Sequence, residues 1–272
     1  MLSFALNHMT LARASYRDLL ETAAGLGCVG VEVRNDLPGP LFDGLPPEEA
    51  GAMARDKGLR ILALAEVKCF NDWSEAKAEE ARALIAVAKA AGAEAVSLIP
   101  RNDGRGLGNG ERQANLRLAL RELKPMLEEA GLTGLVEPLG FTACALRSKA
   151  EAVEVVEALG AASVFRLVHD TFHHHLAGGG PLFPEYTGIV HVSGVVDQTL
   201  STAEMADGHR ILVDGRDRLG NVAQIEALAE AGWNGPISFE AFAAEVHALA
   251  DPAAALAESI AFIRDRQKAA AA

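Results

Sequence analysis

The sequence predicts a closed (β/α)₈ barrel, the TIM-barrel class of α/β fold, from two observations. Short apolar runs alternate with longer alanine-rich amphipathic stretches along all 272 residues, and this alternation produces eight strand–helix units. Strands that alternate with helices in this way are parallel, because each helix carries the chain back across the sheet. Eight units in about 250 residues are typical of the closed barrel.

A doubly wound open sheet is the alternative fold. Such sheets usually carry a glycine-rich phosphate loop directly after the first strand. In this chain the corresponding turn, Asn7–Thr10 (NHMT), contains no glycine. The glycine-rich fragment Gly104–Gly110 (GRGLGNG) follows the fourth strand instead, and we interpret it as a mobile loop.

The strands are predicted where short runs rich in Val, Ile and Leu lie between turn residues. In chain order they are Leu2–Asn7, Cys28–Val33, Arg60–Glu66, Glu94–Ile99, Thr133–Glu137, Ser163–Val168, Thr187–Val192 and Pro236–Glu240.

The helices are predicted from capping residues and stop signals. Serine or aspartate N-caps open those that begin at residues 15, 74, 148 and 251, and glycine follows those that end at residues 26, 57 and 91. In chain order the helices are Ser15–Leu26, Pro47–Lys57, Ser74–Ala91, Glu111–Ala130, Ser148–Leu159, a short one near His173–Ala177, Val222–Ala231 and Asp251–Arg266. No linker or shift in composition divides the chain, so we expect one catalytic domain over residues 1–268 and a frayed tail over 269–272.

Composition excludes several function classes. Lys and Arg number 25 and Asp and Glu 37, for a net charge of −12, which disfavours nucleic acid and anionic membrane surfaces as partners. No apolar run is long enough to span a membrane, and the N-terminus lacks the basic and apolar regions of a secretory signal. The cysteines Cys28, Cys69 and Cys144 are odd in number and form no CxxC motif, which indicates neither disulfides nor a zinc ribbon and suits the cytoplasm.

Polar and ionisable residues end or follow every predicted strand, where a barrel carries its active site. They are Asn7 and His8; Glu32, Arg34 and Asn35; Glu66 and Lys68; Arg101 to Asp103; Glu137; His169, Asp170 and His173; His191; and Glu240. Packing alone does not select such a set.

Four of these residues form a candidate metal site: Glu137 (LVEPLG), Asp170 (LVHDTFH), His191 (IVHVSG) and Glu240 (ISFEAF). Each follows or lies in an apolar run, and a buried carboxylate requires a cation or a shifted pKa. Three carboxylates and one imidazole suit a divalent ion such as Mn²⁺, Mg²⁺ or Co²⁺, and Zn²⁺ can also bind. Any one of these acids could instead pair with a strand-end arginine or lysine, but four on consecutive strands favour the metal.

These four residues, together with His173 three positions after Asp170, resemble the metal site of the xylose-isomerase-like superfamily of sugar isomerases and epimerases. That superfamily includes ketose 3-epimerases, hydroxypyruvate isomerase, inosose isomerase and dehydratase, and endonuclease IV nucleases. The segments ALNHMT, VKCFNDW, IPRNDG, HVSGV and the stretch from His209 to Phe242 are most similar to the inosose (2-keto-myo-inositol) isomerase branch.

The resemblance implies proton transfer through a metal-bound cis-enediolate, with Mn²⁺ as the first choice of ion. Glu137 and Glu240 are similar to the two catalytic glutamates of the family, which are also metal ligands. Asp170 and His191 match the remaining ligands, and His173 matches a histidine that contacts substrate oxygen. The implied substrate is a small keto-polyol or ketose, and barrels of this kind often form homo-oligomers.

Further substrate contacts are predicted at Lys68, His8 and Asn7, at the ends of strands three and one. Lys68 could instead pair with an acid, and Asn7 and His8 could simply satisfy a turn. His174 and His175 are interpreted as solvated loop residues.

One departure from the family concerns Asp197, which lies where ketose epimerases carry a substrate-holding arginine. Arg210, Arg216 or Arg218 could substitute from the long loop, and Arg210 is our candidate. The departure weakens the linear-ketose epimerase hypothesis and favours a cyclic polyol ketone.

Other functions remain open beside inosose isomerase. A ketose 3-epimerase, a hydroxypyruvate-type isomerase or an inosose dehydratase would use the same site, and a non-enzymatic sugar-binding barrel is a further alternative. A nuclease is disfavoured because it needs histidines where this chain has Arg34 and Lys68, although Asp207-x-His209 is superficially similar to its additional ligands.

Overall fold

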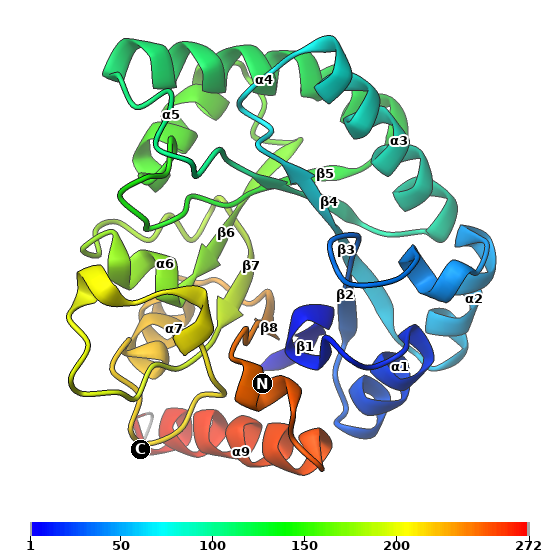
Figure 1. Cartoon of the computed structure of the whole chain (residues 1–272), viewed down its shortest axis with the longest axis vertical. Helices are drawn as coiled ribbons and strands as arrows, with labels where there is room; N and C mark the ends of the chain where they lie inside the picture. The colour runs from blue at the N-terminus through cyan, green and yellow to red at the C-terminus, as the bar shows by residue number, and fades with distance from the viewer. Residues whose placement is uncertain (1, 271–272) are drawn as a thin grey trace.

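The computed structural model describes the backbone of residues 2–270 and the side chains of residues 2–267. Eight parallel strands close into a barrel in which each strand pairs with its sequence neighbours and β1 pairs with β8. The strands form the inner ring and the helices surround it (Figure 1). The predicted (β/α)₈ barrel is confirmed.

The strand boundaries lie within two residues of the predicted ones. The strands are β1 (Ser3–Asn7), β2 (Gly30–Arg34), β3 (Arg60–Lys68), β4 (Ala95–Ile99), β5 (Thr133–Val136), β6 (Phe165–Asp170), β7 (Thr187–Val192) and β8 (Pro236–Phe239). Three strands run slightly further than expected at their carboxyl ends, so that Arg34, Lys68 and Asp170 belong to the sheet itself.

The predicted helices are also present. They are α1 (Tyr16–Gly25), α2 (Pro47–Asp56), α3 (Glu75–Ala91), α4 (Asn109–Ala130), α5 (Lys149–Ala158), α6 (Thr171–Leu176), α7 (Asn221–Glu230) and α9 (Pro252–Ala270). A short helix α8 (Ala244–His247) and four 3₁₀ turns (His8–Leu11, Leu41–Gly44, Thr202–Glu204 and Asp207–His209) were not predicted. Helix α9 extends four residues beyond its expected end, and of the tail predicted to fray, residues 271–272 lie outside the described residues.

The capping residues act as the sequence predicts. The Ser15, Ser74 and Ser148 hydroxyls each accept a hydrogen bond from the backbone N–H three residues later. Gly92 ends α3 in the left-handed conformation, which costs a glycine little. These local signals explain why the helix boundaries are readable without tertiary information.

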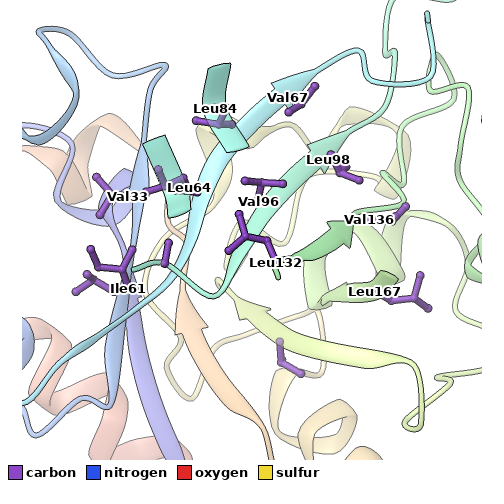
Figure 2. Close-up of a cluster of buried hydrophobic side chains, with 14 of the residues drawn as sticks. Val33, Ile61, Leu64, Val67, Leu84, Val96, Leu98, Leu132, Val136 and Leu167 are labelled. Atoms are coloured by element: carbon purple, nitrogen blue, oxygen red, sulfur yellow. The ribbon is translucent and has the colours of Figure 1, made fainter. Parts of the chain in front are cut away.

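Two apolar layers hold the barrel together. The larger layer lies between the strands and the surrounding helices, and Figure 2 shows part of it, with Val33, Leu64 and Val96 on successive strands near Leu84 of α3. A smaller cluster, which includes Ala5, Ala63, Leu135, Val168 and Ile189, is separate from it. Along β2 the apolar Val31 and Val33 belong to the outer layer, so the alternating Glu32 and Arg34 are left to face inward.

No helix in residues 2–270 is long and apolar enough to cross a membrane.

Candidate active site

The four predicted metal ligands converge at the carboxyl ends of β5 to β8. Glu137 follows β5, Asp170 ends β6, His191 lies in β7 and Glu240 follows β8, and all four are buried. One ligand atom from each lies within 4.8 Å of the others. Four side chains that are far apart in sequence thus form one group of metal-binding size.

His191 provides the test of whether a metal ion fits this group. Its Nε2 lies 3.0 Å from both carboxylate oxygens of Glu32, which fixes the orientation of the ring. Its Nδ1 is buried without a hydrogen-bond partner and lies 3.3 Å from Glu240 Oε2 and 3.8 Å from Glu137 Oε1. Metal-bound histidines commonly use one nitrogen for the ion and the other for a carboxylate. The donor set therefore fits a divalent ion, and the ligand assignment stays a prediction.

Asp170 is placed by local structure. It is the N-cap of α6, and its Oδ1 accepts a hydrogen bond of 2.9 Å from the His173 N–H. Its Oδ2 accepts a hydrogen bond of 2.6 Å from the Arg210 guanidinium. The same cap starts the helix that carries His173 one turn later, so Asp170 and His173 are positioned together.

Glu137 and Glu240 lie in opposite electrostatic environments. Glu240 Oε1 accepts from Arg34 at 2.9 Å, and Oε2 accepts from Arg210 at 2.9 Å. Burial alone would raise the pKa of Glu240, but His191 and the two arginines lower it below its usual range. Glu137 has no arginine or lysine partner within the described chain, and burial raises its pKa to about 7 despite the nearby His191. One carboxylate is held ionised while the other can carry a proton near neutral pH.

Arg210 lies at the centre of the site. It is 1% exposed, and its guanidinium lies over the rings of Phe172 and Phe242, at 4.9 and 4.5 Å from their centroids. Its nitrogens also donate to the Ser193 hydroxyl at 2.9 Å and to Asp207 at 3.2 Å. Together with its bonds to Asp170 and Glu240, these contacts fix Arg210 against two of the four candidate ligands.

The other two arginines of the long loop do not reach the site. Arg216 pairs with Asp214 at the surface, and Arg218 donates to the backbone carbonyls of Asp197 and Leu200. Asp197 itself is exposed, and its Oδ1 accepts hydrogen bonds from the backbone N–H and the hydroxyl of Thr199. The geometry therefore selects Arg210 from the three candidates.

A cavity of about 390 Å³ opens above this group. Its lining includes the candidate ligands Glu137 and Glu240 and the predicted substrate contacts His173, Lys68 and Arg210. The remaining lining residues are Arg34, Asp36, Glu66, Cys69, Ile99, Pro100, Asn102, Asp103, Leu139, Phe141, Asp207 and Phe242. The cavity lies where a TIM barrel carries its active site.

His173 owes its position to a glycine. Gly140, in the loop after β5, packs so closely on α6 that a Cβ there would lie 2.4 Å from the His173 carbonyl oxygen. His173 Nε2 lies 4.0 Å from Glu137 Oε1, and its Nδ1 has no hydrogen-bond partner. A close contact between this loop and α6 thus brings His173 beside a candidate catalytic carboxylate.

Asn7 and His8 have hydrogen-bond partners within the protein, which favours the alternative that they satisfy local structure over the predicted substrate contacts. Asn7 Nδ2 donates to Glu240 Oε1 at 3.2 Å and to Glu32 Oε1 at 3.4 Å, so Asn7 contacts a candidate ligand. The His8 Nε2 contacts the Ala14 carbonyl oxygen at 3.0 Å. Both side chains are buried, and neither belongs to the cavity lining.

Lys68 lies at the mouth of the cavity as expected, with its side chain 74% exposed and its Nζ 4.0 Å from Glu66. One further expectation changes. His174 is not a solvated loop residue: it lies in α6, and its Nδ1 accepts a hydrogen bond from Lys149.

Sequence reasoning gave no role to Glu32 beyond its place at a strand end, and named Arg34 only as a possible ion-pair partner of a strand-end acid, which it is for Glu240. Glu32 is fully buried and orients His191, and Arg34 joins Glu240 to Glu66 and Asp36. Their alternation with Val31 and Val33 was a usable signal, because it places two charged residues on the inner face of a buried strand.

Comparison with known proteins agrees with this geometry. The family model described as "xylose isomerase-like TIM barrel" matches residues 20–266, so this chain belongs to that family. An inosose isomerase of Bacillus velezensis is 25% identical over 256 residues, covering 88% of each chain.

Solved structures share the fold. A xylose isomerase domain-containing protein from Salmonella typhimurium LT2 has a TM-score of 0.87 at 29% identity, with 94% of each chain covered. An IolI protein with a bound zinc atom has a TM-score of 0.85 at 20% identity, with coverage of 96% of this chain and 98% of that chain. An L-ribulose 3-epimerase has a TM-score of 0.68 at 18% identity, with coverage of 100% and 99%.

Proposed function

We propose that the protein is a metal-dependent isomerase of inosose (2-keto-myo-inositol) or a similar keto-polyol. The observation that carries this proposal is the pairing of Glu137 and Glu240 within one metal-sized group, under opposite electrostatic influence. Two facing carboxylates whose pKa values are pushed apart suit the acid and base roles of a proton transfer between adjacent carbons.

A divalent ion held by Glu137, Asp170, His191 and Glu240 would act as a Lewis acid that polarises the substrate carbonyl and acidifies the neighbouring C–H. Mn²⁺ is our first choice for this oxygen-rich donor set, and Mg²⁺, Co²⁺ or Zn²⁺ are alternatives. The zinc in the IolI structure supports a divalent ion without deciding which one.

The side chains of the protein perform the proton transfer. Glu137, which no arginine or lysine of the described chain contacts, is the stronger base of the two glutamates and is suited to accept the proton from the α-carbon. The protonated glutamate can then return the proton to the neighbouring carbon, and Glu240, in the same group, is the other candidate for that step. His173 and Lys68 line the cavity and would bind the substrate oxygens.

The charge of the cavity supports a neutral substrate. Its lining carboxylates are Asp36, Glu66, Asp103, Glu137, Asp207 and Glu240, and its cations are Arg34, Lys68 and Arg210. Both arginines are already paired with carboxylates, so neither is available for a phosphate. The lining suits a polyhydroxylated ketone, whose hydroxyl groups donate to carboxylates, better than a sugar phosphate.

Proton exchange tests the proposal. The Mn²⁺-loaded protein would be incubated with 2-keto-myo-inositol in D₂O, and deuterium uptake followed by NMR. We expect exchange with the wild type and with Glu94→Gln, a surface control at the opposite end of the barrel, and none with Glu137→Gln or after chelation. A metal-loaded protein that incorporates no deuterium would exclude this function.

The same site supports two related reactions. A dehydratase would be recognised in the same assay by the absorbance of an enone product. A ketose 3-epimerase would use the same two glutamates, and Arg210, which lines the cavity, would have to exchange one of its carboxylate partners to hold the substrate. Exchange with a linear ketose, and none with inosose, would select it.

A nuclease lacks support from the site. Within the described residues, the four ligands above form the only group of His, Cys, Asp and Glu suited to a metal ion. Asp207 pairs with Arg210, and the His209 Nδ1 accepts a hydrogen bond from the Ala206 N–H. The proposed cytoplasmic location rests on the unpaired cysteines, and a homo-oligomer remains part of the proposal.

A further inference from the structure

A second cavity, of about 250 Å³, lies beside the catalytic one and shares His173 with it. Its lining comprises Pro138, Arg147, Ser148, Lys149, Ala150, His173, His174, Ala177, Gly179, Pro181 and Phe183. Two cations and no carboxylate belong to this set, in a protein whose net charge is −12. The catalytic cavity, by contrast, carries twice as many acids as bases.

Lys149 is the central cation of this second cavity. It is 8% exposed, and its Nζ lies 2.5 Å from His169 Nδ1 and 3.0 Å from His174 Nδ1. Among the residues with described side chains, no carboxylate lies within ion-pair distance of it. Burial accordingly lowers the pKa of Lys149 to about 7, against the opposing effect of Asp170. Lys149 is thus only partly protonated near neutral pH, and a bound anion would compensate its charge and favour the ammonium form.

The hydrogen-bond network shows that Lys149 acts as a donor. The Gln224 amide nitrogen donates to the carbonyls of Thr171 and Leu219, so its Oε1 is left to accept from His169 Nε2 at 2.8 Å. His169 Nδ1 is then an acceptor and accepts a hydrogen bond from Lys149 Nζ. Two of the three ammonium hydrogens are directed to the imidazoles, and the third has no acceptor in residues 2–267.

Arg147 is the second cation without a carboxylate partner. Its guanidinium donates to the Gly140 carbonyl oxygen at 2.8 and 3.0 Å and to the Leu176 carbonyl oxygen at 3.3 Å. These neutral carbonyl oxygens position the Arg147 guanidinium but do not compensate its positive charge. The nearest acid along the chain, Glu151, pairs with Arg112 at 2.8 Å instead.

The N-terminus of α5 also lines the second cavity. Ser148, Lys149 and Ala150 all line the cavity, and the Ser148 hydroxyl accepts only from the Glu151 N–H. The first-turn N–H groups of a ten-residue helix therefore lie beside the two cations. Free N–H groups and the positive end of the helix dipole attract oxyanions.

We propose that this second cavity, formed by Lys149, Arg147, His174 and the first turn of α5, binds a small oxyanion of the phosphate class. The site is separate from the proposed isomerase centre and shares only His173 with it. A phosphate fits the cavity volume and can accept from the ammonium, the guanidinium and the helix N–H groups together.

Phosphate binding to the Mg²⁺-loaded full-length protein tests the proposal. Isothermal titration with inorganic phosphate would be compared with sodium chloride at matched ionic strength. We expect saturable 1:1 binding, and anomalous density for tungstate between Lys149 and the start of α5 in soaked crystals. Binding no stronger than the chloride control, or tungstate only at the metal group, would overturn the proposal.

Variants locate the binding site. Lys149→Met removes one charge-assisted donor and should weaken phosphate binding by about tenfold or more. The matched control is Lys124→Met, because Lys124 donates to the Leu159 and Gly160 carbonyls at the opposite end of α5 and should leave binding unchanged. Equal affinity of the Lys149→Met variant and the wild type would contradict the proposal. If Lys149→Met does not fold, the wild-type titration and the tungstate position still decide.

Discussion

His191 of β7 and Glu32 of β2 face each other across the barrel, with Nε2 3.0 Å from each carboxylate oxygen of Glu32. This contact leaves Nδ1 directed at the carboxylates of Glu137 and Glu240, where a metal ion would lie. Glu32 is therefore a positioning residue for a candidate ligand, although it comes from the opposite half of the chain.

The first prediction concerns Glu32→Gln. The amide has nearly the same shape, but it carries no charge and offers one acceptor oxygen, so His191 should lose orientation and basicity. Loss of such a partner typically weakens metal affinity by about 10–100-fold. Competition with a chromophoric chelator measures the affinity, and Glu94→Gln, at an exposed ion pair with Arg60, serves as the control. Unchanged affinity in Glu32→Gln would mean that this carboxylate does not support the metal.

The second prediction separates the stability effects of the two glutamates in the metal-free protein. Burial raises the pKa of Glu137 from 4.5 to about 7. The neutral acid is therefore favoured in the folded state, and stability that is fully present below pH 4.5 is lost as the pH rises through about 7. Glu137→Gln should have a higher Tm than the wild type at pH 8 and the same Tm near pH 4.

Glu240→Gln should have a lower Tm than the wild type, because it removes the carboxylate that compensates two buried arginines. Breaking such a buried pair costs about 3–5 kcal/mol. Thermal melts of both variants in chelator, across this pH range, test the contrast. Both variants should lose turnover by about 10²–10⁴-fold, the usual contribution of a general acid or base.

The third prediction concerns Arg210→Met. Removing the guanidinium leaves Asp170 and Glu240 buried without their cation, and we expect a loss of about 3–5 kcal/mol in the metal-free protein. A divalent ion can replace part of the missing charge, so metal should raise the Tm of the variant more than that of the wild type.

Arg216→Met is the matched control, because Arg216 forms an exposed pair with Asp214. Its effect on the free energy of unfolding should stay within about 0.5 kcal/mol. If metal raises the Tm of the wild type and of Arg210→Met equally, the ion does not replace the charge of the Arg210 guanidinium.

The fourth prediction distinguishes a cavity residue from a structural one. Lys68→Met should raise KM with little change in Tm, because its side chain is largely exposed at the cavity mouth. His8→Ala should lower Tm and leave KM unchanged, because the imidazole is buried against the Ala14 carbonyl. Steady-state kinetics and thermal melts on both variants suffice, and the reverse pattern would restore His8 as a substrate contact.

The sequence by itself determined the fold class and most element boundaries. Strand and helix periodicities and the serine caps are local properties, so they can be read along the chain. The four candidate ligands were also predicted, because each follows or lies in an apolar run that leaves a polar side chain at a strand end. In a barrel all such ends meet at one face, so position along the strand already implies proximity.

Only the tertiary structure decided which charges compensate one another. Glu32 with His191, Arg34 and Arg210 with Glu240, and Lys149 with two imidazoles join residues from different strands and helices. The same packing excluded His8 from the cavity and selected Arg210 over Arg216 and Arg218. These choices depend on distances of a few ångströms between side chains from different elements, and local sequence preferences carry no information about such distances.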